Sequence, residues 1–435
     1  MRLFAQTALL PSGWAPDVAI EIAPDGTILS AVPGSRVSPD DERIDGPLIP
    51  GIANLHSHAF QRAMAGTAER RVRGDDDFWS WRDAMYALAA TLDPDALHAA
   101  ALAVYRAMLA AGYTAVAEFH YLHRDPQGRW YADRAAMARA LVEAAKSAGI
   151  AICLLPALYA QGDAGGVPLS PRQQRFAATS DAVLGIARDL RSTYARDPAV
   201  TIGVCAHSLR AVTPGELRAL VDGSPRDVPV HLHVAEQTRE VEAVEAALGA
   251  RPAAWLLEHF DVDARWCFIH ATHLDERERD GLARSGAVAG LCPTTEANLG
   301  DGLFALAPYL RAGGAFGIGS DSNVSIAPVE ELRWLEYGQR LLHRRRIVAA
   351  TGDGASAGET LYRGAAAGGA RACGFAAGTI APQQRADFVV LDDAQPPLAG
   401  APPHELLDRY VFAADRAAPR AVMSGGRWRA GAPSA

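Results

Sequence analysis

Short apolar runs alternate with longer stretches of helical periodicity through the middle of the chain. Segments such as 95–105 and 239–248 have apolar residues at helical spacing, whereas the runs between such segments have the length and composition of buried strands. Eight runs fit this description: 50–56, 114–119, 150–157, 200–206, 228–234, 266–270, 286–292 and 315–320. Strands that alternate with helices form parallel sheets, and eight units in roughly 300 residues predict an α/β protein with a closed, TIM-like (β/α)8 barrel. A doubly wound open sheet is the competing arrangement, but no glycine-rich phosphate loop follows the first run.

The two ends of the chain have a different pattern. At the N-terminal end, apolar runs at 18–22 and 27–30 flank Pro24-Asp25-Gly26, a typical hairpin turn. Strand-like runs return at 386–391 and 421–428. We therefore expect a small β-sandwich domain built from residues 1–48 and 377–435, beside a catalytic barrel of residues 49–376.

Polar residues occur where the predicted barrel strands stop, which is where a barrel of this kind carries its active site. The first strand ends in His56-Ser57-His58, and residues two apart on a strand point to the same face. Neutral imidazole is a good zinc ligand, so this pair is a candidate metal site. Further polar residues follow later strands: Glu118, His120, Tyr121, His207, Arg210, His231, His233, Glu236, His270, His273, Asp321 and Asn323.

Composition narrows the classes of protein. A formal charge of −8 argues against nucleic acid or an anionic membrane as the main partner, and no apolar run is long enough to span a bilayer. The cysteines are far apart and mostly lie in strand-like runs, which is typical of free thiols in a reducing cytosol. Lys146 is the only lysine, so a site that needs a lysine ligand has almost no candidate.

The order His-X-His, His, His and Asp on the first, fifth, sixth and eighth strands resembles the amidohydrolase superfamily across essentially the whole chain. The resemblance implies one divalent metal ion, zinc by ligand type, with His270 near the metal-bound water. The fourth strand (201–207) offers neither lysine nor glutamate as a bridging ligand, so we expect a mononuclear site. The implied ligands are His56, His58, His233 and Asp321.

Glu236 follows His233 by three residues, a spacing that resembles the deaminase branch of the superfamily. In that branch the glutamate shuttles protons. Zinc lowers the pKa of its bound water toward ~7, and a nearby carboxylate can carry the proton to a departing nitrogen. His270 and Asp321 are placed to hold the attacking water. The expected reaction is hydrolytic release of ammonia from a C=N carbon.

Other polar residues near the strand ends indicate which class of substrate the site would bind. Arg82 and Arg210 are candidate carboxylate clamps, because guanidinium binds carboxylate through two parallel hydrogen bonds. Gln61, Tyr121 and His207 could add hydrogen bonds. Two arginines favour a small substrate with carboxylates over a neutral nucleobase.

Two long segments, 56–66 (HSHAFQRAMAG) and 292–302 (CPTTEANLGDG), resemble the formimidoylglutamate deiminases of bacterial histidine degradation. The resemblance implies hydrolysis of N-formimidoyl-L-glutamate to N-formyl-L-glutamate and ammonia, by a cytoplasmic enzyme that is a homodimer. Val234 departs from the small residue expected at its position, but it alternates away from the ligands.

Two other classes remain open. A deaminase of guanine, cytosine or a triazine would share the barrel and the metal, but it would need aromatic walls and amide contacts in place of two arginines. A non-catalytic barrel would usually have lost metal ligands, whereas this chain keeps all four together with Glu236 and His270.

Overall fold

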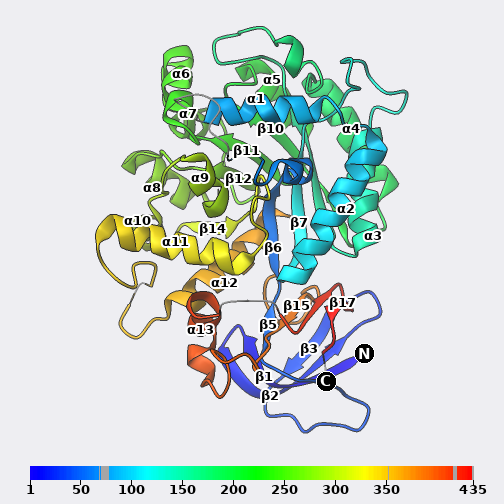
Figure 1. Cartoon of the computed structure of the whole chain (residues 1–435), viewed down its shortest axis with the longest axis vertical. Coiled ribbons are helices and arrows are strands. Elements are labelled where there is room, and N and C mark those ends of the chain that lie inside the picture. Colours follow the sequence, from blue (N-terminus) through cyan, green and yellow to red (C-terminus); the bar gives the residue numbers. More distant parts are fainter. Residues whose placement is uncertain (68, 70–77, 351, 415–418, 434–435) are drawn as a thin grey trace.

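The computed structural model describes the chain except for residues 68, 70–77, 351, 415–418 and 434–435. A barrel of strands surrounded by helices forms one part of the molecule, and a twisted sheet built from segments near both ends of the chain forms the other (Figure 1). Each part has its own cluster of buried apolar side chains. The expected combination of an α/β barrel with a small β-domain made from the chain ends is confirmed.

All neighbouring strands of the barrel are parallel. Their order around the sheet is β14-β13-β12-β11-β10-β8-β7-β6, with β9 paired to β8. The strands are β6 (Ile52–Ser57), β7 (Tyr113–His120), β8 (Ala151–Leu158), β9 (Val200–Ile202), β10 (Val204–Ser208), β11 (Val230–Val234), β12 (Trp266–His270), β13 (Val288–Leu291) and β14 (Ala315–Ile318). The single strand expected at 200–206 is thus two strands separated by Gly203, where a Cβ atom would lie 2.6 Å from the carbonyl oxygen of Pro229.

The barrel closes between its first and last strands. A parallel bridge joins Ser57 to Asp321, the amide of Asp321 donates to the carbonyl of His56 (2.9 Å), and the amide of His58 donates to the carbonyl of Asp321 (2.9 Å). The seam therefore places the ends of β6 and β14 side by side, which brings together residues separated by more than half of the chain.

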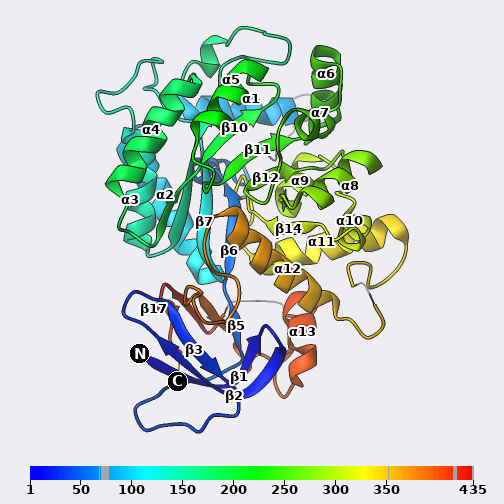
Figure 2. The ribbon, with the colours of Figure 1, turned by 180° about the vertical axis from the view of Figure 1, so that it is seen from behind.

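Helices cover the outside of the barrel (Figure 2). They are α2 (Pro94–Ala111), α3 (Ala136–Ala148), α4 (Ser180–Thr193), α5 (Pro214–Gly223), α6 (Thr238–Leu248), α7 (Pro252–His259), α8 (Glu276–Ser285), α9 (Pro293–Leu299), α10 (Leu306–Arg311), α11 (Pro328–His343) and α12 (Ala357–Ala372). Both helices expected from periodicity are present, as α2 and α6. The start of α2 follows local rules, since the Asp93 side chain accepts from the Ala96 amide (2.8 Å) and a proline occupies the first turn.

The small sheet joins the two chain ends through β5 (Leu48–Pro50). This strand pairs parallel with β1 (Arg2–Leu10) and antiparallel with β15 (Phe388–Val390). The remaining strands are β2 (Gly13–Ile22), β3 (Ile28–Val32), β4 (Glu42–Ile44), β16 (Ala421–Ser424) and β17 (Arg427–Gly431). Because β5 leads into β6 after one residue, the small sheet lies at the amino ends of the barrel strands, away from the predicted site.

Two elements lie at the carboxyl ends of the strands. The 3₁₀ segment η1 (Ala59–Met64) follows His58 directly, and α1 (Phe78–Ala89) runs across that end of the barrel (Figure 1). On the opposite side of the molecule, α13 (Leu406–Phe412) packs against α11 and α12. Within the described residues, no helix combines the length and the apolar character needed to cross a bilayer.

Candidate active site

Three histidines and an aspartate meet at the carboxyl end of the barrel. His56 and His233 approach to 3.0 Å between their Nε2 atoms. The Asp321 Oδ1 atom lies 3.4 Å from His56 Nε2 and 3.5 Å from His58 Nε2. All four side chains are buried. The structure therefore brings together the ligand set expected from the sequence.

The barrel seam explains the placement of Asp321. Its backbone is in the left-handed region (φ 46°), a conformation that costs free energy for a residue with a Cβ atom. The Asn323 side chain spans the turn by donating to the carbonyls of His58 (3.2 Å) and Asp321 (3.1 Å), and it accepts from the Ser320 hydroxyl (2.7 Å). This buried network holds the strained turn against β6.

The donor set fits a divalent metal ion. The Nδ1 atoms of His58 and His233 lie 2.9 Å and 2.7 Å from the backbone carbonyls of Phe119 and His207. A proton on each Nδ1 leaves the Nε2 lone pair facing the centre, which is the usual support for a metal-bound histidine. Burial lowers the pKa of His56 to about 3, so this imidazole is also neutral. The imidazoles outweigh the effect of burial and lower the pKa of Asp321, which keeps a carboxylate beside the lone pairs.

A second group of polar residues adjoins this centre. His270 Nε2 lies 3.6 Å from Glu236 Oε1 and 3.7 Å from Asp321 Oδ2, while its Nδ1 lies 3.3 Å from Glu296 Oε1. Burial raises the pKa of Glu236 to about 7, which leaves the carboxyl able to gain or lose a proton near neutral pH. The three expected catalytic side chains, Glu236, His270 and Asp321, are therefore neighbours.

The sequence interpretation assigned no role to Glu296. Glu296 lies in the first turn of α9, where its Oε1 atom accepts from the Cys292 amide (2.8 Å) and also contacts Nδ1 of His270 (3.3 Å). A carboxylate four residues after the seventh strand could have been found by the same strand-end argument that found Asp321.

The five expected substrate-binding residues all line one pocket. They are Gln61, Arg82, Tyr121, His207 and Arg210, and the same pocket is lined by His58, His233, Glu236, His270 and Asp321. Gln61 donates to the Tyr121 hydroxyl (2.9 Å), which ties η1 to the end of β7.

Arg210 is the most buried cation of the pocket. Its side chain is 5% exposed, and its Nε atom has no hydrogen-bond partner among the described residues. Burial alone would lower the pKa of Arg210, but the carboxylates of Glu240 and Glu236 and the Tyr159 hydroxyl group raise it. Burial of a charged group with an unpaired hydrogen-bond donor costs free energy unless an anion pairs with that group. Arg210 therefore marks where a carboxylate fits.

Aromatic side chains form much of the remaining wall, which the sequence interpretation did not expect. They come from α1 and from the segments after β8: Phe78, Trp81, Tyr86, Tyr159 and Phe176. Phe176 is the centre of this wall, with ring centroids of Tyr86, Tyr121 and Tyr159 within 5.1–5.7 Å. Aromatic walls therefore do not distinguish this pocket from one that binds a flat nucleobase, and the arginines are the feature that does.

Comparisons with known proteins agree with this architecture. Residues 48–429 match the model of the "Amidohydrolase family", and residues 1–45 match the "Formimidoylglutamate deiminase HutF, N-terminal domain". The chain is 49% identical over 426 residues to a formimidoylglutamate deiminase of Pseudomonas aeruginosa, which covers 98% of this chain and 94% of the relative.

Solved structures are similar over nearly the whole length. The crystal structure of an amidohydrolase from Brucella melitensis has a TM-score of 0.92 and 47% identity, and it covers 98% of this chain and 96% of its own. An adenosine deaminase from Xanthomonas campestris with bound zinc has a TM-score of 0.79 at 22% identity, with 98% and 92% coverage. The second likeness concerns the fold alone.

Proposed function

The chain belongs to the amidohydrolase family, and from this premise we propose that it hydrolyses N-formimidoyl-L-glutamate to N-formyl-L-glutamate and ammonia. The relative from Pseudomonas aeruginosa supports this substrate. The observation that carries the proposal is the shared pocket, in which Arg82 and Arg210 lie with the His and Asp group. One end of such a pocket suits two carboxylates, and the other suits attack on an amidine carbon.

His56, His58, His233 and Asp321 would hold one divalent ion, zinc by ligand type. Such an ion lowers the pKa of a water molecule and thereby supplies a nucleophile at neutral pH. Backbone groups orient two of these ligands: the carbonyls of Phe119 and His207 fix the ring orientations of His58 and His233.

Glu236 is the proposed proton carrier. It accepts a proton from the attacking water as the oxygen bonds to the amidine carbon, and it donates that proton to the terminal nitrogen. The proton that remains on the hydroxyl then passes through Glu236 to the same nitrogen as the bond between the carbon and this nitrogen breaks, so ammonia leaves and the carbon becomes the formyl group. A carboxyl group whose pKa burial raises to about 7 suits both halves of this transfer.

His270 is the proposed partner of the attacking water. Its Nδ1 faces Glu296, and its Nε2 faces Glu236 and Asp321. With Nδ1 hydrogen-bonded to a carboxylate, the ring is held so that Nε2 points at the place where water must lie. Glu296 acts only through this ring and is a positioning residue.

Arg82 and Arg210 are the proposed partners of the two substrate carboxylates. Arg210 is buried at the end of β10 and Arg82 is half-buried on α1, so the two cations approach the pocket from different sides. Gln61, Tyr121 and His207 complete the polar lining. A neutral base leaves both guanidinium groups without an anion, which disfavours it.

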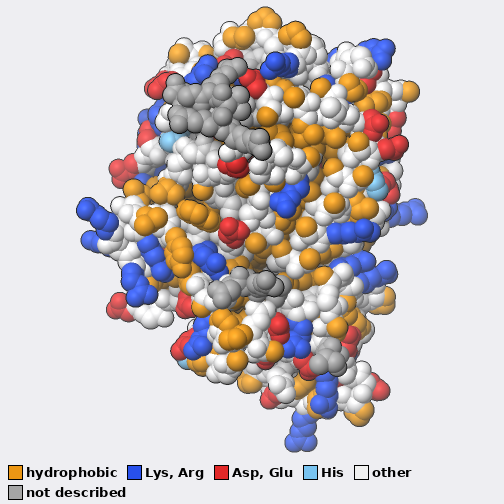
Figure 3. All heavy atoms as spheres, in the orientation of Figure 1, with side chains coloured by type: hydrophobic (Ala, Val, Ile, Leu, Met, Phe, Trp, Pro, Cys, Tyr) orange, Lys and Arg blue, Asp and Glu red, His pale blue; other side chains and the backbone are white. Residues whose placement is uncertain are grey.

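We also propose that the chain forms a homodimer through α11. Trp334, Tyr337 and Leu341 are exposed at helical spacing on this helix, with Leu303 and Ile347 exposed nearby. Figure 3 shows hydrophobic side chains over α11. Exposed apolar side chains that gather on one face in this way are typical of an interaction surface. Light scattering should give the mass of a dimer for wild type and of a monomer for Leu341→Glu; a monomeric wild type would contradict this.

Ammonia release from the zinc-loaded protein tests the function. N-formimidoyl-L-glutamate should give rapid release, whereas guanine, cytosine and N-formimidoyl-L-aspartate should give little. Release from a base and none from the glutamate compound would keep the metal chemistry and overturn the role of the arginines.

A further inference from the structure

Three guanidinium groups surround one indole ring at the substrate end of the molecule. The Cζ atoms of Arg82, Arg239 and Arg210 lie 4.3 Å, 4.4 Å and 5.4 Å from the ring centroid of Trp79. Arg82 and Arg210 line the pocket. The sequence interpretation assigned no role to Arg239, which lies on α6. It is not among the described residues that line the pocket.

Helix stability does not explain Arg239. It occupies the first turn of α6, close to the positive end of the helix dipole, where a cation is unfavourable and an anion is favoured. The next residue, Glu240, stabilises the start of the helix instead, because its carboxylate accepts from the amides of Ala235 and Glu236. The charge of Arg239 therefore opposes local stability, which is common where a residue serves a site.

The three cations also repel one another. Among the described residues, no carboxylate forms a salt bridge within 4.0 Å with any of these arginines. The face of an aromatic ring attracts guanidinium, so Trp79 holds the cations together. Because Arg239 is exposed, solvent screens part of its field, but the remainder falls on the same pocket end as the other two charges. The electrostatic binding free energy at such a cluster should be most favourable for a ligand that carries more than one negative group.

We propose that Arg239 is a positioning residue that selects ligands with two carboxylates over ligands with one. It supplies a third positive charge, which Trp79 holds beside Arg82 and Arg210. The inference rests on the proposed function for its substrate, but the charge arrangement can be tested by binding alone.

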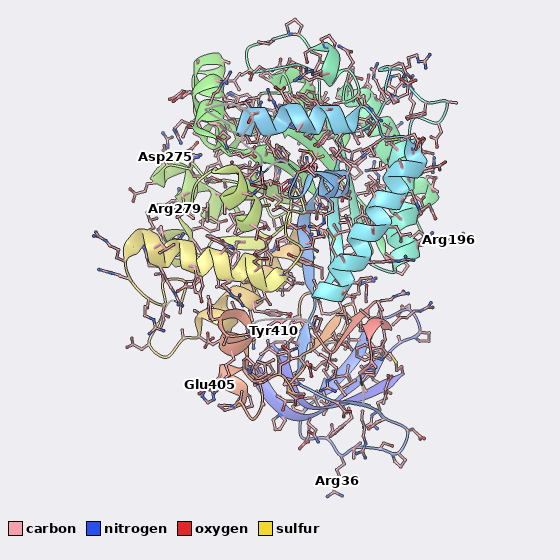
Figure 4. The ribbon with its side chains drawn as sticks, viewed as in Figure 1. Arg36, Arg196, Asp275, Arg279, Glu405 and Tyr410 are labelled. Atoms are coloured by element: carbon pink, nitrogen blue, oxygen red, sulfur yellow. The ribbon has the colours of Figure 1, made fainter. Side chains whose placement is uncertain are left out.

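The experiment compares the wild type with Arg239→Gln, Arg239→Lys and a control, Arg196→Gln. Arg196 is an exposed arginine that precedes the fourth strand, whereas Arg210 follows it; Figure 4 shows Arg196 on the flank of the barrel. Calorimetry measures binding of N-formyl-L-glutamate at low and high salt. Kinetics compare N-formimidoyl-L-glutamate with N-formimidoyl-4-aminobutyrate, which has one carboxylate.

Arg239→Gln should weaken N-formyl-L-glutamate binding about threefold at low salt and reduce its salt dependence, since one partly screened charge is lost. KM for the two-carboxylate substrate should rise by the same factor with kcat unchanged, and KM for the one-carboxylate substrate should rise less. Arg239→Lys and Arg196→Gln should match the wild type, and thermal unfolding checks that each variant is folded.

Unchanged binding in Arg239→Gln, an equal loss for both substrates, or an equal loss in Arg239→Lys would overturn the inference. The proposed function fails separately. If the wild type binds N-formyl-L-glutamate but releases no ammonia from the formimidoyl compound, the reaction is wrong, and the binding comparison still decides the role of Arg239.

Discussion

The two ends of the pocket are built in opposite ways. At the metal-binding end, every expected ligand comes from the last residues of a strand or from the turn that follows it, and backbone carbonyls fix the orientation of His58 and His233. At the arginine end, Arg82 comes from α1, Trp79 precedes it by one turn, and Arg239 comes from the start of α6. The first end has rigid strands beneath it, whereas the second combines Arg210, which follows β10, with side chains from helices above the strands.

This difference suggests a division of labour. Positions fixed by a closed barrel give the precise geometry that chemistry needs, because a small displacement of a reacting group is costly. The half-buried Arg82 and the exposed Arg239, both on helices, can select a ligand by charge with less exact placement. Changes at the first end should therefore abolish turnover, and changes at the second should mainly alter substrate affinity.

The largest effect should come from a lost metal ligand. His233→Asn should lower kcat/KM by roughly four orders of magnitude, a modest part of the acceleration that enzymes achieve, because the nucleophile is no longer generated. His231→Asn is the matched control: this histidine lies two residues earlier on β11, and its Nε2 contacts the Ala372 carbonyl (2.8 Å). Metal analysis should find the ion missing only from His233→Asn. Full metal content in that variant would remove His233 from the ligand set.

Loss of the proton carrier should come next. Glu236→Gln keeps the size of the side chain but cannot accept a proton, so kcat should fall roughly 10³-fold, within the range for general acid–base groups. Metal content should stay at the wild-type value. The control is Glu242→Gln, which changes an exposed residue on α6, the helix that follows Glu236. It should leave kcat and the metal content unaltered. Turnover close to wild type in Glu236→Gln would show that another group moves the proton.

The arginine end should respond in affinity. Arg210→Lys retains the charge but loses the planar pair of donors, and the loss of about 2 kcal/mol should raise KM roughly thirtyfold with a smaller change in kcat. Steady-state kinetics with N-formimidoyl-L-glutamate give both constants. A variant that lost kcat while keeping KM would contradict the proposed division between the two ends.

Metal removal should give a smaller effect, on stability. The unliganded centre leaves a carboxylate and imidazole lone pairs facing one another in a buried site, so bound metal should stabilise the fold by about 2–4 kcal/mol when present well above its dissociation constant. Calorimetric unfolding before and after chelation measures the difference, and added zinc should restore it. An unchanged unfolding temperature would indicate that these side chains hold no ion.

Sequence reasoning succeeded where local pattern and global fold agree. The strands of the barrel followed from periodicity, and the strand-end positions of the polar residues predicted that they meet at one end of it. The ligand set His56, His58, His233 and Asp321 came from the resemblance to the amidohydrolase superfamily, and the structure places these side chains together. These features depend on short segments whose relative position the barrel fixes. The placement of Asp321 beside β6 needed only the knowledge that the barrel closes.

Prediction from the sequence was less complete where tertiary contacts determine the local structure. The break at Gly203 arises from the close approach of Pro229, a contact between strands that no local pattern reveals. The packing of Phe176 against Tyr86 joins segments that are far apart in the chain. The approach of Arg239 to Trp79 likewise depends on how α6 and α1 meet. Such contacts are set by helix placement, which periodicity leaves open.

The most direct test of the central claim follows the amidine carbon. Zinc-loaded protein is given N-formimidoyl-L-glutamate labelled with ¹³C at the formimidoyl carbon, in water enriched in ¹⁸O, and the products are identified by NMR and mass spectrometry. We predict that the label appears in the formyl group of N-formyl-L-glutamate, with one ¹⁸O atom and one equivalent of ammonia. Labelled formamide with free glutamate, or no turnover, would contradict the account.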